Sequence, residues 1–252
     1  MEQVPLTVEN LETGGQTGSL VGRYPASKRL FDLAFSVAAL TVSWPLILAG
    51  AVAVKLTSAG PAFYRARRVG QGGRPFTMLK LRTMFPGTDS LDRRVTAADD
   101  DRVTPVGRVL RRLKVDELPQ LWNVVRGEMS VVGPRPEDWE IFQRYYTPEQ
   151  RRIAAGRPGI VSPVDLNWYP DLTYHDPPPD GVSAQEWYVQ RHLPLQVAEG
   201  LQYLEQQNLW LDFVIVVRTV LSVTIYSVLK APKRPLPDDY QVSRAKWSSG
   251  ID

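Results

Sequence analysis

The chain contains no cysteine and only two histidines among its 252 residues. The absence of cysteine excludes disulfides and thiolate metal sites, which fits the cytoplasmic side of a membrane. His175 and His192 are isolated and lack the spacing of zinc ligands. An excess of one charge is also missing, because a net charge of +3 with a pI near 9.1 is too weak and dispersed to predict nucleic-acid binding. It suits an anionic lipid surface or an anionic substrate.

A local absence is more informative, because no residue from Leu33 to Val54 is charged. A helix of this length would reach about 33 Å, enough to cross the hydrocarbon core of a bilayer. Lys28 and Arg29 precede the run, and Lys55 follows it. We therefore expect a membrane helix. A cleaved signal peptide is not expected, since the run starts well inside the chain, behind an acidic, Gly-rich stretch without an Ala-x-Ala site.

Pro45 lies in the middle of this run, directly after Trp44. An internal proline removes one hydrogen bond and bends a helix, so the segment can enter a membrane and leave by the same face. Positive charge flanks both ends of the run, which gives no reason to place the ends on opposite sides. We favour this re-entrant arrangement over a plain span.

The chain divides into four parts by composition. Residues 1–26 are polar and Gly-rich and are expected to form a flexible tail. Residues 27–56 are expected to form the re-entrant helix and residues 57–230 one catalytic domain, and the family resemblance given below implies that 160–205 is a variable region that sets specificity. Residues 231–252 are read as a C-terminal tail. The length is sufficient for one domain with a sizeable core plus an anchor.

A β-hairpin is predicted from two strands, 61–68 and 74–84, around the turn at 70–73. The turn contains three glycines but no lysine at the offset that a phosphate-binding loop requires, so a hairpin turn is the better interpretation. Alternation along the second strand places Lys80 and Arg82 on the same face.

Two helices are expected next. Thr104 is a good N-cap and Pro105 suits the first helical position, which predicts a helix over 105–114. A second helix from about Glu117 stops near Gly127, and this places Asp116 and Glu117 at its N-terminus.

The remaining elements are weaker predictions. An amphipathic helix is expected over 139–146, and residues 156–181 are rich in Pro and Gly and expected to be irregular. The stretch 209–229 has two charges and predicts a helix in the core or at the lipid interface, with a second span less favoured. The fold class is thus α+β and mostly helical, with a small hairpin and amphipathic interfacial helices around one active site.

Asp116 and Glu117 are the residues most suited to phosphate chemistry. A carboxylate can attack phosphorus and hold the transferred group as a mixed anhydride, provided that positive charge surrounds the phosphate oxygens. Two carboxylates are also enough to hold Mg²⁺ together with substrate phosphates. The cations available nearby are Lys80, Arg82, Arg108, Arg111, Arg112 and Arg135.

Simpler interpretations remain open. Asp116 alone would serve as an N-cap, and the basic stretch 108–114 as a solvated face or a contact with anionic lipids. The run 99–101 consists of three aspartates and resembles the acidic metal motif of many sugar transferases. It predicts a runner-up function, a metal-dependent glycosyltransferase without a covalent intermediate. A catalytically silent membrane scaffold is a third hypothesis.

Taken in order, the motifs resemble the bacterial sugar transferases called monotopic phosphoglycosyl transferases. The matching pieces are Lys28 and Arg29 with Asp32, the apolar helix with Pro45, Gly60 and Pro61, Arg68 with Gly70, 80–84, 113–123, 127–130, 133–136, 157–160, and Leu211 with Asp212. Each piece is weak alone, but the ordered series is highly specific.

The resemblance implies a two-step exchange at the cytoplasmic face of the bacterial inner membrane. Asp116 would attack the β-phosphorus of a UDP-sugar and expel UMP, and polyprenyl (undecaprenyl) phosphate would then take the phosphosugar. Glu117 would hold Mg²⁺ with Asp116, and the helix broken at Pro45 would place this site beside the lipid headgroups. The residues implied to bind phosphates or nucleotide are Lys80, Arg82, Arg111, Arg135 and Arg157.

The chain departs from the commonest family pattern after the 157–160 motif, where Val161, Ser162 and Pro163 replace the usual Thr-Gly-Trp. Trp44 also stands where serine is common. The departure after the 157–160 motif leaves the sugar open. The resemblance admits a homodimer, membrane lipids as partners, and a role in starting a polysaccharide or glycoconjugate.

Overall fold

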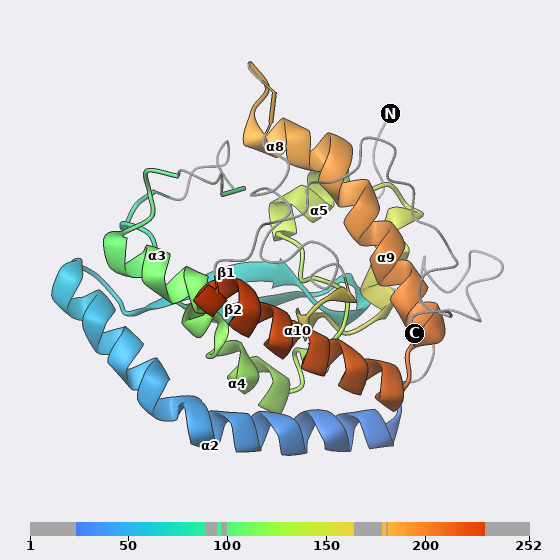
Figure 1. The fold of residues 1–252 in the computed structure, drawn as a ribbon. Helices are drawn as coiled ribbons and strands as arrows, with labels where there is room; N and C mark the ends of the chain where they lie inside the picture. The colour runs from blue at the N-terminus through green and yellow to red at the C-terminus, as the bar shows by residue number, and fades with distance from the viewer. Residues whose placement is uncertain (1–23, 89–94, 97–99, 164–177, 180, 230–252) are drawn as a thin grey trace.

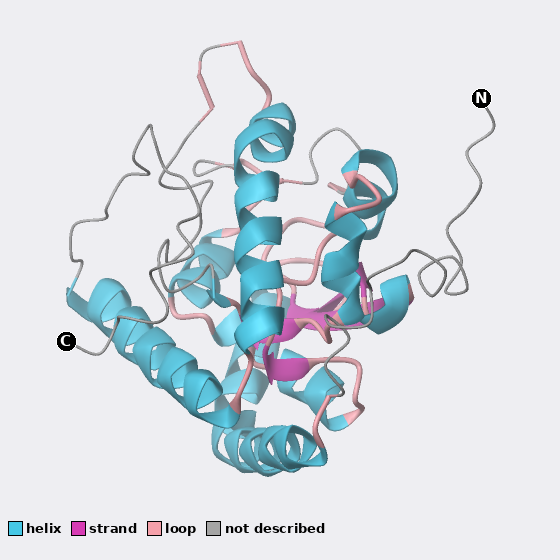
Figure 2. Cartoon of the chain, turned by 90° about the vertical axis from the view of Figure 1, so that its right-hand side faces the viewer, coloured by secondary structure: helices cyan, strands magenta, loops and turns pink. Residues whose placement is uncertain are grey.

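The computed structural model describes residues 24–88, 95–96, 100–163, 178–179 and 181–229. The predictions for nearly all of the N-terminal tail, for the C-terminal tail, and for Asp99 and His175 fall outside these residues. Figure 1 shows a long helix, α2, running along one side of a body of shorter helices. Figure 2 shows the few strands near the centre of that body with helices around them. The expected α+β, mostly helical class is confirmed for the described residues.

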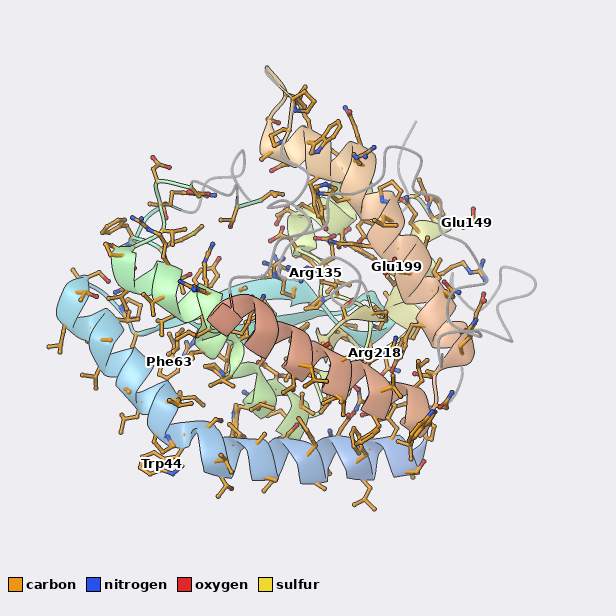
Figure 3. The ribbon with its side chains drawn as sticks, in the orientation of Figure 1. Trp44, Phe63, Arg135, Glu149, Glu199 and Arg218 are labelled. Atoms are coloured by element: carbon orange, nitrogen blue, oxygen red, sulfur yellow. The ribbon has the colours of Figure 1, made fainter. Side chains whose placement is uncertain are left out.

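Helix α2 spans Ala26–Thr57 and contains Pro45. Its bounds match the predicted 27–56 to within one residue at each end. The helix is continuous but changes direction in its middle, and Figure 3 places the side chain of Trp44 at this corner. The missing hydrogen bond at Pro45 and the clash of its ring with the preceding turn explain the bend. Within the described residues, α2 is the one helix long and apolar enough to cross a membrane.

One side of α2 faces the body and the other does not. The buried side carries charged or small residues for most of its length, namely Lys28, Asp32, Ser36, Ser43, Gly50 and Val54. The opposite side exposes large apolar side chains, including Val42, Trp44, Leu46 and Leu56. Such a surface is unusual for a protein face in water and is typical of a lipid contact.

The predicted hairpin is confirmed. Strand β1 spans Phe63–Val69 and pairs antiparallel with β2, Pro75–Leu81. The connection contains the short 3-10 turn Gln71–Gly73, in which Gly72 and Gly73 both have φ of +71°. A side chain would be strained at that φ, so these glycines are what allow the tight reversal.

Helix α3 spans Pro105–Arg112, and the Thr104 side chain accepts a hydrogen bond from the Gly107 N–H, as the sequence predicted. The next helix differs from expectation, since α4 spans only Gln120–Val125. The dyad Asp116 and Glu117 lies before it, in the 3-10 turn Val115–Glu117. Asp116 is therefore not the N-cap of α4, and the predicted start of this helix was three residues early. Pro119 has no N–H to donate to the Val115 carbonyl, so the 3-10 turn and α4 do not merge into one continuous helix.

A second, two-stranded sheet was not foreseen. Strand β3 spans Ser130–Val132 and pairs in parallel with β4, Gly159–Val161, within the stretch 156–181 that was expected to be irregular. The loops that flank these strands approach closely, because a Cβ added at Gly133 would lie 2.4 Å from the Arg157 carbonyl oxygen. Glycine is therefore required where the motifs 133–136 and 157–160 meet.

The rest of the body is helical. Helix α5 spans Trp139–Tyr145, close to the predicted 139–146, and a 3-10 stretch follows over Gln150–Ala155. Inside the predicted variable region lie α8, Ala184–Trp187, a π-helical turn over Tyr188–His192, and α9, Leu193–Gln206. Helix α10, Leu209–Leu229, has the bounds that the sequence predicted.

The core joins these elements across long sequence distances. One cluster packs Val131 and Val132 of β3 against Ile215 of α10 and Tyr203 of α9. A smaller cluster of Val54, Leu81 and Leu110 joins α2, β2 and α3. The second cluster fixes the C-terminal half of α2 to the elements that lead into the 3-10 turn Val115–Glu117.

Candidate active site

Asp116 lies in a tight turn between two helices that pack on the hairpin. Its side chain is buried, with 5% of the residue exposed. Its Oδ1 atom is buried and has no hydrogen-bond partner among the described residues. A buried acceptor without a donor is costly, and such atoms concentrate where a ligand completes the arrangement. This oxygen is thus a candidate to receive a ligand, a metal ion or a phosphorus atom.

Glu117 is held by two ammonium groups that reach the same oxygen. The Lys80 Nζ of β2 donates a hydrogen bond to Glu117 Oε1 at 3.1 Å, and the Lys114 Nζ lies 3.6 Å from the same atom. Burial by itself would raise the pKa of Glu117. The positive charges of Lys114, Lys80 and Arg135 outweigh burial and hold this pKa far below its usual value. Glu117 is therefore ionised at any physiological pH.

The adjacent carboxyl behaves in the opposite way. Burial raises the pKa of Asp116, and the negative charge of Glu117 raises it further. Lys80, Lys114 and Arg111 oppose this rise with their positive charges. A carboxylate with a raised pKa is a stronger base and nucleophile than an ordinary one. The turn therefore carries two neighbouring carboxyl groups with contrasting properties, an arrangement common in active sites.

Asn123 determines where α4 and the turn sit on the hairpin. This residue is buried, and its Oδ1 accepts a hydrogen bond from the Leu79 N–H at 3.0 Å. Its Nδ2 donates to the Thr77 carbonyl at 2.7 Å and to the Glu128 carboxylate at 2.6 Å. The side chain thus takes the place of a neighbouring strand along β2. This contact brings Glu117 within reach of Lys80 on the same strand.

Arg111 is also fixed by its surroundings. Its Nε donates to the Thr83 hydroxyl at 2.8 Å, just beyond the end of β2. Helix α3 lies directly on this segment, because a Cβ added at Gly107 would lie 2.0 Å from the Thr83 carbonyl oxygen. The close approach of α3 to Thr83 places the charge of Arg111 near Asp116, where it lowers the pKa of that carboxyl.

Arg135 reaches the site from the loop after β3, and Figure 3 shows it near the centre of the body. Its charge acts on Glu117. The next acidic residue, Glu137, is buried and accepts hydrogen bonds from the hydroxyls of Tyr146 at 3.0 Å and Tyr188 at 2.6 Å. Two tyrosines, one of them from the variable region, therefore fix the segment that carries Arg135.

Two predicted phosphate-binding residues lie elsewhere. Arg82 Nη2 donates to the Ser58 hydroxyl at 2.8 Å and to the Ser58 carbonyl at 3.0 Å, at the C-terminus of α2. Its Nε and Nη1 have no partner among the described residues. Arg157 stacks on the Tyr24 ring at 4.0 Å, and its Nη2 lies 3.5 Å from Gln71 Oε1 at the hairpin turn. Phosphate binding by Arg82 and Arg157 stays a prediction, and among the described residues neither forms a hydrogen bond or ion pair with the dyad.

The charged residues before the apolar run attach α2 to the body. Lys28 is buried and donates to Asp212 of α10 at 2.6 Å and to the Val132 carbonyl at 3.1 Å. Arg29 donates to the Val124 and Val125 carbonyls at 2.7 and 2.9 Å, which satisfies the C-terminus of α4. Lys28 thus ties α2 to α10 and β3, and Arg29 ties it to α4, the helix that follows the dyad.

Within the acidic run 99–101, the carboxylate of Asp100 is not available as a metal ligand. Asp100 is bound by Arg102 through two contacts, at 2.8 Å to Oδ1 and 2.6 Å to Oδ2. A bidentate arginine occupies the oxygens that a cation would need. Across the described part of the chain, no group of three His, Cys, Asp or Glu side chains is placed to hold a metal ion. The two carboxylates of the dyad are the remaining candidates.

The sequence predicted Asp116, Glu117, Lys80, Arg111 and Arg135, which the structure brings together, but it gave no signal for two residues that shape the site. Lys114 has φ of +56°, and it is the one non-glycine residue with a positive φ in the described structure. A left-handed conformation costs roughly 1–2 kcal/mol for an L-residue, and nothing in the local pattern signalled it. Asn123 was part of a quoted motif, but its role depends on a strand 46 residues away.

Comparisons with known proteins identify the family to which this sequence is similar. The model of the family described as Bacterial sugar transferase matches residues 23–226. The chain is 39% identical over 199 residues to the UDP-glucose:undecaprenyl-phosphate glucose-1-phosphate transferase of Caulobacter vibrioides, covering 78% of this chain and 69% of that protein. A Xanthomonas campestris protein of the same name is 36% identical over 227 residues, covering 86% and 42%. The exopolysaccharide production protein ExoY of Sinorhizobium fredii is 33% identical over 225 residues, covering 83% and 91%. The chain thus spans less than half of the Xanthomonas protein but nearly all of ExoY.

Proposed function

Because the chain belongs to the bacterial sugar transferase family, we propose that it transfers a sugar 1-phosphate from a UDP-sugar to polyprenyl phosphate, giving polyprenyl diphosphate sugar and UMP. The names of the Caulobacter and Xanthomonas relatives describe this type of exchange with UDP-glucose. The observation that carries the proposal is the buried Oδ1 of Asp116, which has no hydrogen-bond partner among the described residues and lies within the influence of Lys80, Lys114 and Arg111.

The first step makes and breaks one bond to phosphorus. An Asp116 carboxylate oxygen attacks the β-phosphorus of the donor, and the bond from that phosphorus to the bridging oxygen breaks. The bridging oxygen keeps the electron pair and leaves as part of UMP, while the sugar phosphate stays on Asp116 as a mixed anhydride. Burial supports this role, because an ion with few water contacts is a more reactive nucleophile.

In the second step, a phosphate oxygen of polyprenyl phosphate attacks the same phosphorus. The bond to Asp116 breaks, the electron pair returns to the carboxylate, and the lipid leaves with a diphosphate sugar. Lys80, Arg111 and Arg135 face the charge that builds on the phosphoryl oxygens in both steps. Fixed cations in a partly dry site stabilise such charge more strongly than water does.

The dyad also fits Mg²⁺. This ion usually takes one or two protein carboxylates and completes its coordination with substrate phosphates and water. Asp116 Oδ1 has no hydrogen-bond partner in the part of the chain that the structure describes, and Glu117 stays ionised because of its lysines, so these two residues would hold the ion. When bound, Mg²⁺ would neutralise negative charge on the donor diphosphate.

The proposed location is the cytoplasmic face of the inner membrane, with α2 entering and leaving the same leaflet. Two features support the contact with a membrane that this location requires. The outer side of α2 is apolar along its length, and α10 exposes a second apolar stripe that includes Trp210, Phe213 and Val220. Tryptophan and phenylalanine on one side of a helix are typical of contact with the membrane interface. A site at the headgroup level would meet the phosphate of its lipid acceptor directly.

The experiment that tests the function traps the intermediate. The full chain in detergent is incubated with Mg²⁺ and a UDP-sugar labelled on its β-phosphate, without polyprenyl phosphate, then denatured and assayed for bound label and released UMP. UDP-glucose and UDP-N-acetylgalactosamine are the first donors, since relatives carry those names. We expect label on the wild type and none on Asp116→Asn.

Asp101→Asn is the matched control, because Asp101 is exposed and belongs to the competing acidic run. It should keep label and activity. Label that survives Asp116→Asn, or never forms while lipid product does, would reject the covalent route. Loss of activity with Asp101→Asn would favour the metal-dependent glycosyltransferase. If the folded wild type releases no UMP with any UDP-sugar and polyprenyl phosphate, the hypothesis of a catalytically silent membrane scaffold would be favoured.

A further inference from the structure

Lys114 occupies a conformation that an L-residue rarely adopts. It follows Leu113, the C-cap of α3, with φ of 56° and ψ of 19°, directly before the turn that carries Asp116 and Glu117. Glycine or asparagine adopts this conformation at helix C-termini without comparable strain. A strained residue beside a catalytic centre is more often a functional requirement than an accident of packing.

The left-handed turn has a clear geometric result. It reverses the chain after α3, so that the Lys114 ammonium returns toward the residues that follow it and lies 3.6 Å from Glu117 Oε1. Lys80 reaches the same oxygen from β2, at 3.1 Å. The second distance is that of a hydrogen bond, whereas 3.6 Å is longer than one. Lys114 therefore attracts Glu117 through charge, and Lys80 already satisfies the oxygen.

The charges around the dyad exceed what two carboxylates require. Four cations act on Asp116 or Glu117, namely Lys80, Lys114, Arg111 and Arg135. Lys80 and Arg111 are tied by hydrogen bonds to Glu117 and Thr83. The site thus carries a net positive charge before any substrate binds, which suits a dianionic diphosphate. About a quarter of the Lys114 side chain is exposed, so an incoming ligand can reach it.

We propose that Lys114 is a donor-binding residue whose ammonium contacts a phosphoryl oxygen of the nucleoside diphosphate sugar. The inference rests on the proposed function and adds a residue to it. On binding, the ammonium exchanges its attraction to Glu117 for a charge-assisted hydrogen bond to the diphosphate. When the bridging bond breaks, the leaving nucleotide gains negative charge, and this contact becomes stronger.

Replacing Lys114 with glycine relieves the backbone strain of the positive φ and at the same time removes the ammonium charge. Lys114→Gly should fold as well as the wild type, with a similar melting temperature. Its KM for the UDP-sugar and its inhibition constant for UDP should rise about tenfold or more, the effect of losing one charge-assisted hydrogen bond. The KM for polyprenyl phosphate should stay unchanged. Lys114→Arg should restore most of the donor affinity.

Arg126→Gln is the control for net charge, because Arg126 is more than half exposed and pairs only loosely with Glu128 at 3.7 Å. It should leave the donor KM unchanged. An unchanged donor KM in Lys114→Gly, or a rise in the lipid KM instead, would overturn the inference and leave Lys114 as a helix-terminating residue. The inference would also be overturned if the donor KM rose equally in Lys114→Gly and in Arg126→Gln.

Failure of the proposed function can be distinguished from failure of the binding role of Lys114 by a measurement that does not need turnover. Calorimetric titration of wild type and Lys114→Gly with UDP and Mg²⁺ measures nucleotide binding without turnover. If the wild type releases no UMP but binds UDP more tightly than Lys114→Gly, the reaction is wrong and the binding role stands. Equal UDP affinity of the two proteins rejects the binding role, whether or not UMP is released.

Discussion

At the scale of single residues, the raised pKa of Asp116 follows from competing effects on one carboxyl group. Burial and the neighbouring Glu117 favour its protonated form, while the surrounding cations favour its ionised form. The balance raises its pKa but leaves the adjacent residue, Glu117, ionised. The same set of lysines thus acts on two acids with opposite outcomes, because one is in direct contact with an ammonium and the other is not.

This balance predicts the pH dependence of the first step. Only ionised Asp116 can attack phosphorus, so the first-turnover rate of UMP release should fall as pH decreases, with a midpoint above the ordinary value of 3.8. Lys80→Met removes one opposing charge and should move that midpoint upward. Rapid-quench measurements from acidic to neutral pH give both values. A midpoint at or below 3.8, or a downward shift in Lys80→Met, would contradict the assignment.

At the scale of elements, the site depends on how α4 is attached to β2. Asn123 bonds to both polar groups that this stretch of β2 presents, the Leu79 N–H and the Thr77 carbonyl. Backbone groups at a buried strand edge need such partners. The dyad lies immediately before α4, so the contact that satisfies β2 also sets the distance from Glu117 to Lys80.

Asn123→Ala should therefore lower the free energy of unfolding by about 2–4 kcal/mol, because buried polar groups lose their partners. Chemical denaturation of the detergent-solubilised chain measures this change. Gln143→Ala on α5 is the surface control and should change stability by less than about 0.5 kcal/mol. Equal stability of Asn123→Ala and wild type would show that β2 does not need this side chain.

At the scale of the whole molecule, both halves of α2 pack on the same body. Lys28 and Arg29 attach its first turn to β3, α4 and α10. Near its end, Gly50 and Val54 lie against Leu81 and Leu110 of β2 and α3. A straight transmembrane helix would separate its two ends by the thickness of the bilayer, and one body could not hold both. The bend at Pro45 removes this conflict.

The arrangement predicts that both ends of α2 face the cytoplasm. The chain has no native cysteine, so single substitutions Ser27→Cys and Ala59→Cys can be labelled cleanly. Both should react with an impermeant thiol reagent in inside-out vesicles and neither in intact spheroplasts. Leu48→Cys, on the apolar side, should react only after solubilisation. Labelling of Ser27→Cys and Ala59→Cys from opposite sides would establish a span.

The sequence alone determined those features that depend on near neighbours. An uncharged run with a central proline specifies a bent apolar helix, a glycine-rich turn between two alternating segments specifies a hairpin, and Thr104 with Pro105 specifies the start of α3. These signals are local because backbone conformation and side-chain periodicity are set within one or two turns of chain. The identity of the dyad also came from the sequence.

The tertiary structure decided which cations meet the dyad. Alternation along the strand predicted Lys80 and Arg82 on the same face. In the structure, Lys80 bonds to Glu117, whereas Arg82 bonds to Ser58, because β2 ends at Leu81. Strands β3 and β4 escaped prediction, since each has three residues and is stabilised by a partner far along the chain. Contacts of this kind depend on how distant segments close on one another, and local sequence carries no record of that geometry.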